Sequence, residues 1–332
     1  MRILAALVAV LSLTVAAHAA VTEGRQPIRT LELGSYIAGV AADGTTAATA
    51  LSGDVTSSGI VDEGLIWSPA SGKVQKSKPM RGPGPWCGRE SVAVAGPIVA
   101  WMHSCESNNE LKQGLVVWAP PRAPRVLVAV DAVRRPDRRL SKPLADGDVL
   151  VYNRGTTLFR ILRDGRARPV ADKIQASDVD AGRIVGWFDD GRLGVLNASG
   201  RVIRTLEIDR ERARDVQLDG DFLLVVRFSN VEIRSVRTGE IFRTFPIDGG
   251  WGPTVAAAGG IAVVAAGNRI DVVRLADGRR RVLARVGQRA LAGIAVEPTG
   301  VFYAEQVDGC PPRCARLTFV PRSEVDARLR RS

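Results

Sequence analysis

Residues 215–246, DVQLDGDFLLVVRFSNVEIRSVRTGEIFRTFP, contain four short apolar runs separated by two glycine turns and one polar loop. The first turn is Asp219-Gly220, a pair typical of two-residue β-hairpins, and the second is Thr238-Gly239. Glycine suits both turns because they require a positive φ, which other residues adopt at a cost. The stretch therefore predicts four antiparallel strands joined in the order tight turn, loop, tight turn.

The same order of turns recurs along the whole chain. The first turn of each unit has a glycine, and successive glycines are separated by 52, 51, 35, 38, 39 and 41 residues, at Gly44, Gly96, Gly147, Gly182, Gly220, Gly259 and Gly300. In five units a second glycine follows 28, 18, 18, 19 and 19 residues later, at Gly72, Gly165, Gly200, Gly239 and Gly278. A period of about 40 to 50 residues is typical of four-stranded propeller blades. The chain is therefore predicted to be an all-β, seven-bladed β-propeller.

Two units depart from this pattern. The second unit has Pro120, Pro121 and Pro124 where the second glycine would fall, which predicts an edge strand because proline donates no ladder hydrogen bond. The seventh unit ends without an evident fourth strand. At the other end of the chain, residues 28–33, IRTLEL, closely match the outer-strand sequence IRTLEI at 203–208. Residues 27–33 are therefore predicted to complete the seventh blade and to close the ring.

The chain resembles the WD40-like, TolB-like and YVTN-type bacterial propellers over residues 27–322. The resemblance lies in the period, the turn chemistry and the tryptophans of Trp67-Ser68-Pro69 and Trp118-Ala119-Pro120. It implies a secreted bacterial propeller repeat protein. The Gly-His and Trp-Asp pairs of eukaryotic WD40 repeats are absent from the chain. Because one propeller fold hosts many functions, the resemblance implies a fold and no particular function.

The first residues indicate export. Met1-Arg2, an apolar run to Ala17 and the small-residue site Ala17-His18-Ala19 are typical of a secretory signal peptide, with cleavage expected after Ala19. An uncleaved membrane anchor is the alternative, but it needs a longer apolar run of about 20 residues. No cysteine follows the run, so a lipobox is absent. The predicted organisation is a signal peptide at 1–19, a linker at 20–26, one propeller at 27–325 and a charged tail at 326–332, in a secreted monomer without a stable membrane span.

The formal net charge is +11, from 40 arginines and 6 lysines against 35 acidic residues. Two interpretations stay open: the composition of a GC-rich genome, or attraction to an anionic partner. Phosphate-binding glycine loops and aromatic-basic platforms are absent, so no cofactor and no nucleic acid are expected. The mature chain has one histidine, His103, which is too few for a histidine metal site and favours no Ser-His-Asp site.

Chain direction assigns the connections to two faces of the ring. The first and third connections of the blades are nearly all tight and share one face, the turn face. The second connections and the links between blades share the opposite face, the loop face. The long segments fall on the loop face, which is where function is expected. Its basic and aromatic residues form the candidate binding face: Lys76, Lys78, Arg81, Trp86, Arg89, Arg134, Arg135, Arg138, Arg139 and Trp251.

All four cysteines also fall on the loop face. Cys87 and Cys105 lie nearly opposite each other across the hairpin that turns at Gly96, and Cys310 and Cys314 flank a three-residue loop. Four cysteines permit three connectivities, but local pairing needs no long reach. Because disulfides persist in exported proteins, Cys87–Cys105 and Cys310–Cys314 are predicted as disulfides.

Two functions follow as hypotheses. The first is a non-catalytic exported scaffold that binds a protein or an anionic cell-wall polymer through the loop face. The alternative is a propeller hydrolase or lyase that uses carboxylates at the mouth of the central channel, with or without Ca²⁺. Asp178 and Asp215, in the inner strands of the fourth and fifth units, are the candidate carboxylates. No residue is assigned a catalytic or metal-binding role.

Overall fold

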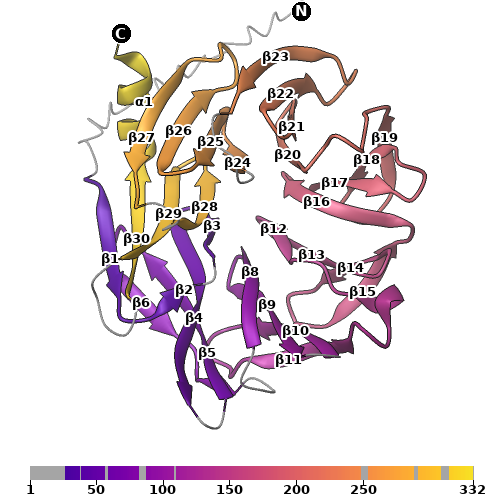
Figure 1. The fold of residues 1–332 in the computed structure, drawn as a ribbon, viewed down its shortest axis with the longest axis vertical. Helices are drawn as coiled ribbons and strands as arrows, with labels where there is room; N and C mark the ends of the chain where they lie inside the picture. Colours follow the sequence, from indigo (N-terminus) through magenta and orange to yellow (C-terminus); the bar gives the residue numbers. More distant parts are fainter. Residues whose placement is uncertain are drawn as a thin grey trace, which may run out of the picture.

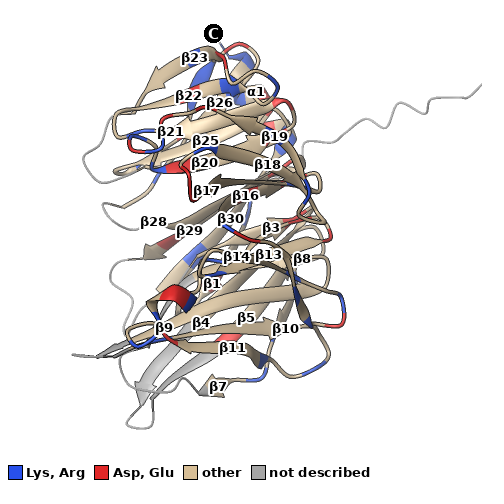
Figure 2. Ribbon diagram, turned by 90° about the vertical axis from the view of Figure 1, so that its right-hand side faces the viewer, with Lys and Arg blue, Asp and Glu red and all other residues tan. Residues whose placement is uncertain are grey.

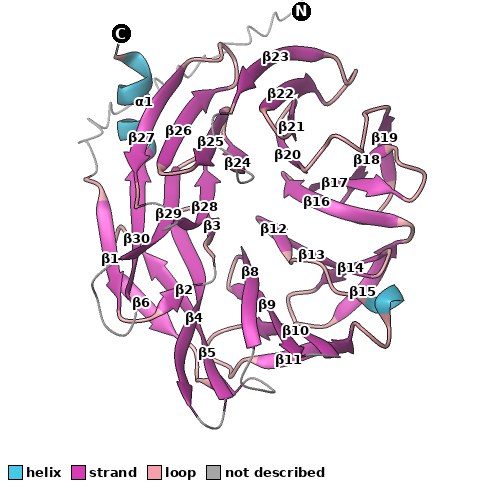
Figure 3. Ribbon diagram, viewed as in Figure 1, coloured by secondary structure: helices cyan, strands magenta, loops and turns pink. Residues whose placement is uncertain are grey.

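In the computed structural model, seven antiparallel sheets stand around a central axis as the blades of a propeller (Figure 1). The structure describes residues 27–37, 39–56, 59–81, 87–107, 110–247, 253–287, 291–307 and 314–331. Each sheet runs from an inner strand beside the axis to an outer strand at the rim, and strands dominate the described secondary structure (Figure 3). The predicted seven-bladed, all-β propeller is confirmed.

Blades 2 to 6 each consist of four consecutive strands. Blade 2 contains β8 (Cys87–Ala95), β9 (Ile98–Ser107), β10 (Glu110–Trp118) and β11 (Arg125–Asp131). Blade 3 contains β12 (Leu144–Asp146), β13 (Val149–Arg154), β14 (Thr157–Ile161) and β15 (Ala167–Ala171). Blade 4 contains β16 (Ile174–Asp180), β17 (Arg183–Phe188), β18 (Leu193–Asn197) and β19 (Val202–Leu206). Blade 5 contains β20 (Asp215–Asp219), β21 (Phe222–Val226), β22 (Asn230–Ser235) and β23 (Ile241–Pro246). Blade 6 contains β24 (Thr254–Ala258), β25 (Ile261–Ala266), β26 (Arg269–Arg274) and β27 (Arg280–Arg285).

Blade 1 has a divided inner strand and a divided outer strand. It contains β2 (Tyr36–Ile37), β3 (Ala41–Asp43), β4 (Thr46–Thr56), β5 (Gly59–Ser68), β6 (Lys73–Lys76) and β7 (Met80–Arg81). Both β2 and β3 pair with β4, and both β6 and β7 pair with β5. In blade 2 the three prolines of the second unit lie between β10 and the outer strand β11, as their position predicts.

Blade 7 is built from both ends of the chain. It contains β28 (Leu291–Glu297), β29 (Gly300–Val307) and β30 (Cys314–Pro321), and its outer strand is β1 (Arg29–Leu33). β1 pairs antiparallel with β30, from Arg29 opposite Phe319 to Leu33 opposite Ala315. The predicted closure of the ring by the N-terminal strand is confirmed.

The hydrophobic core is divided into seven clusters, and each cluster lies between two neighbouring blades. Between blades 1 and 2, for example, the fully buried Trp101 packs with Trp118 and with Ala48. Gly64 makes room for them, because a Cβ at this position would lie 2.8 Å from the Trp118 ring. Since every cluster needs two blades, no blade buries its apolar side chains alone, and the ring is stable as one unit.

The chain ends in helix α1 (Arg322–Arg330), which packs against blades 6 and 7. Val325 and Leu329, four residues apart on one helix face, are fully buried there. Arg279 of blade 6 donates a hydrogen bond from Nη1 to the Leu329 carbonyl at 3.0 Å. Residues 326–330, which the sequence assigns to a charged tail, are therefore part of a docked helix. Among the described residues, no helix is long and apolar enough to cross a membrane.

Candidate functional site

The inner strands of the blades line a central channel with a cavity of about 260 Å³. Most of its wall consists of small apolar side chains, which include Ala41, Ala93, Ala145, Ala256 and Ala295. Polar and charged groups lie toward the two ends of the inner strands, where the channel opens onto the turn face and the loop face. The two mouths therefore differ from the wall, and they also differ from each other.

At the turn face, five inner strands end in a carboxylate that accepts a hydrogen bond from the first turn of the following blade. Asp180 Oδ2, for example, accepts from the Gly220 N–H at 3.0 Å. We call these five residues the latch carboxylates: Asp43, Asp146, Asp180, Asp219 and Glu297. The other two inner strands, β8 and β24, end in Ala95 and Ala258. The latch carboxylates thus connect five of the seven blade junctions by a side chain that ends the strand beside the axis.

Burial at the turn-face mouth changes the protonation of several latch carboxylates. Removal from solvent is the main cause that raises the pKa of Asp146, Asp219 and Glu297, and it brings the pKa of Glu297 to about 8. The charges of Asp43 and Asp146 add to the increase at Glu297, whereas the hydrogen bond from Gly44 opposes it. Glu297 is therefore largely protonated at neutral pH, and it still accepts the Gly44 N–H at 3.1 Å.

Both carboxylates that the sequence selects line the channel cavity, Asp215 at the loop-face end of β20 and Asp178 nearer the turn-face end of β16. Asp215 opens β20, and Asp178 follows a bulge in β16. Asp178 Oδ2 accepts from the Leu218 N–H of the next blade at 2.7 Å. Asp215 accepts from Gln217 Nε2 at 3.1 Å and lies 3.9 Å from Lys142 Nζ. All of these side chains except Leu218 line the channel cavity.

The two channel carboxylates have different surroundings. Burial raises the pKa of Asp178 to about 8, and the charge of Asp215 contributes to this increase. Asp215 has a half-exposed side chain and a lysine partner. A protonated carboxylic acid near a second carboxylate that has a cationic partner is an arrangement that acid-base catalysis uses. The same hydrogen bond from Leu218 also gives Asp178 a structural role at the junction of blades 4 and 5. Among the described residues, no group of three or more His, Cys, Asp or Glu side chains could hold a metal ion.

The candidate binding face is only partly described. Lys76 at the end of β6 and Lys78 are exposed, and Arg81 lies in β7. The four arginines at 134, 135, 138 and 139 are exposed in the link between blades 2 and 3, around a 3-10 turn at Pro136–Arg138. The first group therefore belongs to blade 1, and the second to the link from blade 2 to blade 3. Trp86 and Trp251 lie outside the described residues, as do the side chains of Arg81 and Arg89.

The cysteines keep the positions that the prediction requires, where they are described. β8 and β9 place Cys87 directly opposite Cys105, and Cys314 is the first residue of β30. The Cys87 side chain and Cys310 lie outside the described residues, so both disulfides stay predictions. His103 is buried in β9 against Gly114, where a Cβ would lie 2.3 Å from the imidazole Nε2.

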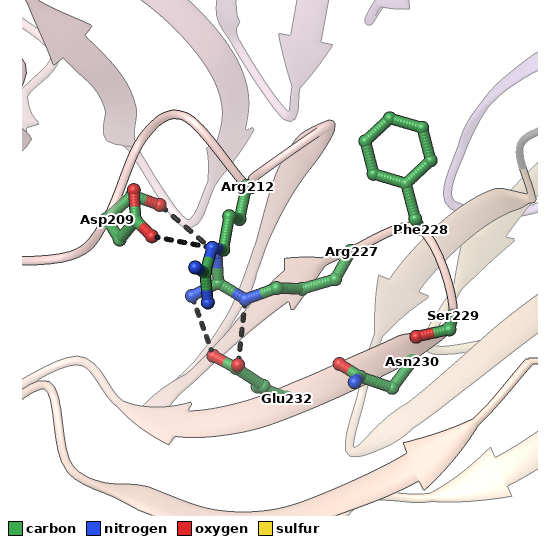
Figure 4. A pocket seen from close by; sticks show the side chains of 7 residues that line it. All are labelled: Asp209, Arg212, Arg227, Phe228, Ser229, Asn230 and Glu232. Carbon is green, nitrogen blue, oxygen red and sulfur yellow. Dashed lines mark hydrogen bonds and ion pairs between the residues drawn. The ribbon is translucent and has the colours of Figure 1, made fainter.

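A hollow of about 370 Å³ on the loop face of blade 5 was not predicted from the sequence (Figure 4). It lies between the link from blade 4 to blade 5 and the connection between β21 and β22, and its lining residues are Asp209, Arg212, Arg227, Phe228, Ser229, Asn230 and Glu232. We call it the blade 5 hollow. Two signals were available in the sequence: the alternating arginines of 210–214, RERAR, and a phenylalanine, Phe228, in a polar connection.

No protein-family model matches the chain, and no curated protein matches its sequence. Solved structures match its fold. A chain of the mitotic checkpoint complex is similar over 97% of this chain and 99% of its own length, with a TM-score of 0.56 and 11% identity. Hsv2 of Kluyvelomyces marxianus is similar over 84% of this chain and 96% of its own, with a TM-score of 0.52 and 10% identity. PorZ of Porphyromonas gingivalis, a surface component of the type-IX secretion system, is similar over 89% of this chain and 39% of its own, with a TM-score of 0.51 and 10% identity. These similarities show the propeller fold.

Proposed function

We propose that this chain is a non-catalytic exported propeller that binds a protein or an anionic cell-envelope polymer through its loop face. The observation that carries the proposal is the different use of charged side chains at the two faces. On the turn face, acidic side chains at the mouth are engaged with the backbone of neighbouring blades. On the loop face, arginines extend into solvent from two links between blades. One is the link at 134–139, and the other borders the blade 5 hollow.

In the link at 134–139, the arginines are accessible to an anionic partner. The Arg134 side chain is 77% exposed and lies 3.3 Å from Asp131, and Arg138 lies 3.9 Å from the exposed Asp137. Such exposed ion pairs contribute at most about 1 kcal/mol, so a competing anionic partner replaces them at low cost. Exposed arginines such as Arg163 and Arg237 also occur in the turns of the opposite face, and basic residues are therefore present on both sides of the ring (Figure 2). A test must compare the two faces.

Two of the similar folds come from assemblies, the mitotic checkpoint complex and a type-IX secretion system. At 10% to 11% identity they support a propeller as a frame for binding, and the choice of face depends on the residues of this chain. Export is part of the proposal and is supported by residues 1–19. N-terminal sequencing of the protein recovered outside the cytoplasm is expected to begin at Ala20, and an intact Met1 there would contradict cleavage.

Binding is tested with two variants that remove equal charge. The loop-face variant replaces Arg134, Arg135, Arg138 and Arg139 by serine, and the turn-face control replaces Arg163, Arg166, Arg201 and Arg237 by serine. Pull-down from cell-envelope fractions is expected to lose material only with the loop-face variant, and less material is expected at high salt because exposed charges are screened. Equal capture by both variants, or no capture by the parent at low salt, would contradict the proposal.

The hydrolase or lyase alternative is kept because Asp178 and Asp215 line the same cavity with different partners. If the channel is catalytic, Asp178→Asn and Asp215→Asn each lower turnover of a chromogenic glycoside or an acidic polysaccharide by about 100-fold or more. Asp164→Asn, at an exposed turn carboxylate, serves as the control. Turnover that is absent from the parent, or equal in all three variants, rules this alternative out for the substrates tested.

A further inference from the structure

We propose that the blade 5 hollow binds an acidic peptide segment of a partner protein, with an aromatic side chain of that segment packed on Phe228. This inference rests on the proposed function, because it assigns part of the loop face to one class of partner. The hollow is formed by side chains from two connections that are about 20 residues apart in sequence, and Figure 4 shows how they lie around it.

The floor of the hollow is a fixed ion cluster. Arg227 binds Glu232 through Nε at 2.7 Å and Nη2 at 3.2 Å, and its Nη1 donates to the Asp209 carbonyl at 3.1 Å. Arg234 binds the same carboxylate at 2.6 Å. Burial tends to raise the pKa of Glu232, but hydrogen bonds from both arginines outweigh it and lower the pKa. One ionised carboxylate between two guanidinium groups leaves the floor with an excess of positive charge.

The rim adds cations that point into solvent. Arg212 is 83% exposed and its nearest acidic partner, Asp209, lies 3.6 Å away. Within the blade link, Arg210 packs against Trp187, with its guanidinium 6.0 Å from the ring centroid, and Arg214 packs over Phe228. Floor and link together contain five arginines and four carboxylates: Arg210, Arg212, Arg214, Arg227 and Arg234, with Glu207, Asp209, Glu211 and Glu232. The site therefore favours an anionic ligand.

Phe228 shows that charge is not the whole recognition surface. Its side chain is 65% exposed at the connection between β21 and β22, and the Arg214 guanidinium lies 3.6 Å from the ring centroid. A stacked guanidinium holds the aromatic ring in place, which lowers the entropy lost on binding. Exposed aromatic residues beside arginines are typical anchors of protein contacts. A simple polyanion would use the arginines and leave Phe228 in water, whereas a peptide with acidic and aromatic residues uses both.

The hollow also has the size for a few side chains. Its volume of about 370 Å³ lies at the lower end of the range of ligand pockets. It is open to solvent beside an exposed link, so a segment of a larger protein can enter without displacing any blade. An aromatic group on Phe228 and one carboxylate on Arg212 would occupy it.

The experiment measures peptide binding by fluorescence anisotropy with the whole mature protein. The probe is a labelled peptide of alternating glutamate and phenylalanine residues. Two comparison probes replace either glutamate by glutamine or phenylalanine by alanine, and polyglutamate represents an anionic polymer. The parent is expected to bind the first probe best, with an affinity at least fivefold above each comparison probe.

Matched variants locate the site. Phe228→Ala and Arg212→Ser are each expected to weaken binding of the acidic-aromatic peptide about tenfold, which corresponds to about 1.4 kcal/mol. The control for the first is Phe242→Ala, because Phe242 is 59% exposed on the outer strand of the same blade. The control for the second is Arg237→Ser, because Arg237 is 75% exposed with an aspartate at 3.5 Å on the turn face. Both controls are expected to stay within twofold of the parent.

Several results would overturn the inference: no binding of the acidic-aromatic peptide, equal binding of polyglutamate, or equal losses in variants and controls. The result also separates this inference from the proposed function. If Phe228→Ala and Arg212→Ser retain capture of envelope material while the variant at 134–139 loses it, the loop-face proposal stands and the peptide site fails. If peptide binding depends on Phe228 and Arg212 but the parent captures no envelope material, the peptide site stands and the cell-envelope part of the proposed function fails.

Discussion

The two faces of this propeller use charged side chains for different purposes. On the turn face, a carboxylate at the end of an inner strand reaches the backbone of the next blade and stabilises the ring. On the loop face of blades 4 and 5, arginines pack on aromatic rings or extend into solvent. The difference teaches that stability is concentrated in contacts between blades, which leaves the loop-face links free to carry a binding surface.

The strongest test of this assignment removes a contact between blades altogether. Deletion of residues up to 33 takes away β1, its ladder with β30 and the buried Leu33. We expect the melting temperature to fall by about 10 °C relative to a protein that starts at Ala20, from a loss of about 5 kcal/mol in lost burial and hydrogen bonds. Differential scanning calorimetry measures the shift.

Two point variants measure how much of the effect of the deletion comes from one buried side chain, with an equivalent residue of another blade as the comparison. Leu33 and Ile208 occupy the same position in the two similar sequences and are buried to the same extent, at 7% and 6% exposure. Leu33→Ala and Ile208→Ala are each expected to cost about 2 to 4 kcal/mol. A deletion that melts at the same temperature as the parent would show that β1 does not close the ring.

Removal of latch carboxylates should have the next largest effect. Asp180 and Asp219 serve consecutive junctions, from blade 4 to blade 5 and from blade 5 to blade 6. The double variant Asp180→Ala/Asp219→Ala is expected to lose about 2 to 4 kcal/mol in urea unfolding, because two backbone N–H groups lose their acceptors. Peptide binding at the blade 5 hollow should not change. A loss of binding with intact stability would reverse the roles that we assign to the two faces.

The stability of the ring should fall as pH rises from about 4.5 to about 8. In this window the folded protein keeps a proton on Glu297, whose pKa is raised from 4.5 to about 8, while the unfolded chain releases it. Asp178, with a pKa of about 8, acts in the same direction. Each group contributes at most about 1.4 kcal/mol per pH unit. Urea midpoints measured across the window report the slope.

Glu297→Gln is expected to reduce this slope and Asp178→Asn to reduce it further. Asp164→Asn is the control, because a backbone hydrogen bond from Arg166 lowers the pKa of Asp164, and its contribution is lost only at pH values below the usual 3.8. A slope that is unchanged in Glu297→Gln would contradict the protonated state of this latch carboxylate.

The smallest expected effect concerns Ala181, a turn residue whose N–H donates to a latch carboxylate. Ala181 has a φ of 46°, in the left-handed region, and its N–H donates to Asp146 at 2.6 Å. Ala181→Gly relieves this strain, but glycine also gives the unfolded chain more conformational freedom. We expect the free energy of unfolding to rise by about 0.5 kcal/mol on balance. Ala95→Gly, at the end of an inner strand without positive φ, should lose about as much. A loss in both variants would contradict the strain at Ala181.

The fold was predictable from the chain because its strongest signals are local. Turn glycines such as Gly220 and Gly239 are required by the hairpins in which they lie. Seven repeats of the same order of strands and turns then determine the architecture. Even the closing strand was predictable, because 28–33 repeats the sequence of an outer strand. The docked helix α1 was missed, since two apolar residues, Val325 and Leu329, in a charged segment give a weak pattern.

The latch carboxylates were visible in the sequence and were explained only in part. Asp219 before Gly220 is accounted for by turn chemistry alone, yet its carboxylate accepts a hydrogen bond from Gly260, which is 41 residues away. That distance becomes short only when the ring places consecutive turns side by side. The blade 5 hollow was missed for the same reason, because Arg212 and Phe228 belong to separate connections. Asp178 and Asp215 line one cavity, and their role as a catalytic pair stays a prediction.

The seventh blade has a consequence for the order of assembly. The ion pair between Glu32 and Arg316, at 2.6 Å, joins residues 284 positions apart, so the first described strand of the propeller pairs with the last. Six blades can form from contiguous chain while β1 has no partner. Contacts of such high sequence separation form slowly, because a long loop must close before they are made. We therefore expect ring closure to be the final and slowest step of folding, with β1 exposed as an open edge until β30 arrives.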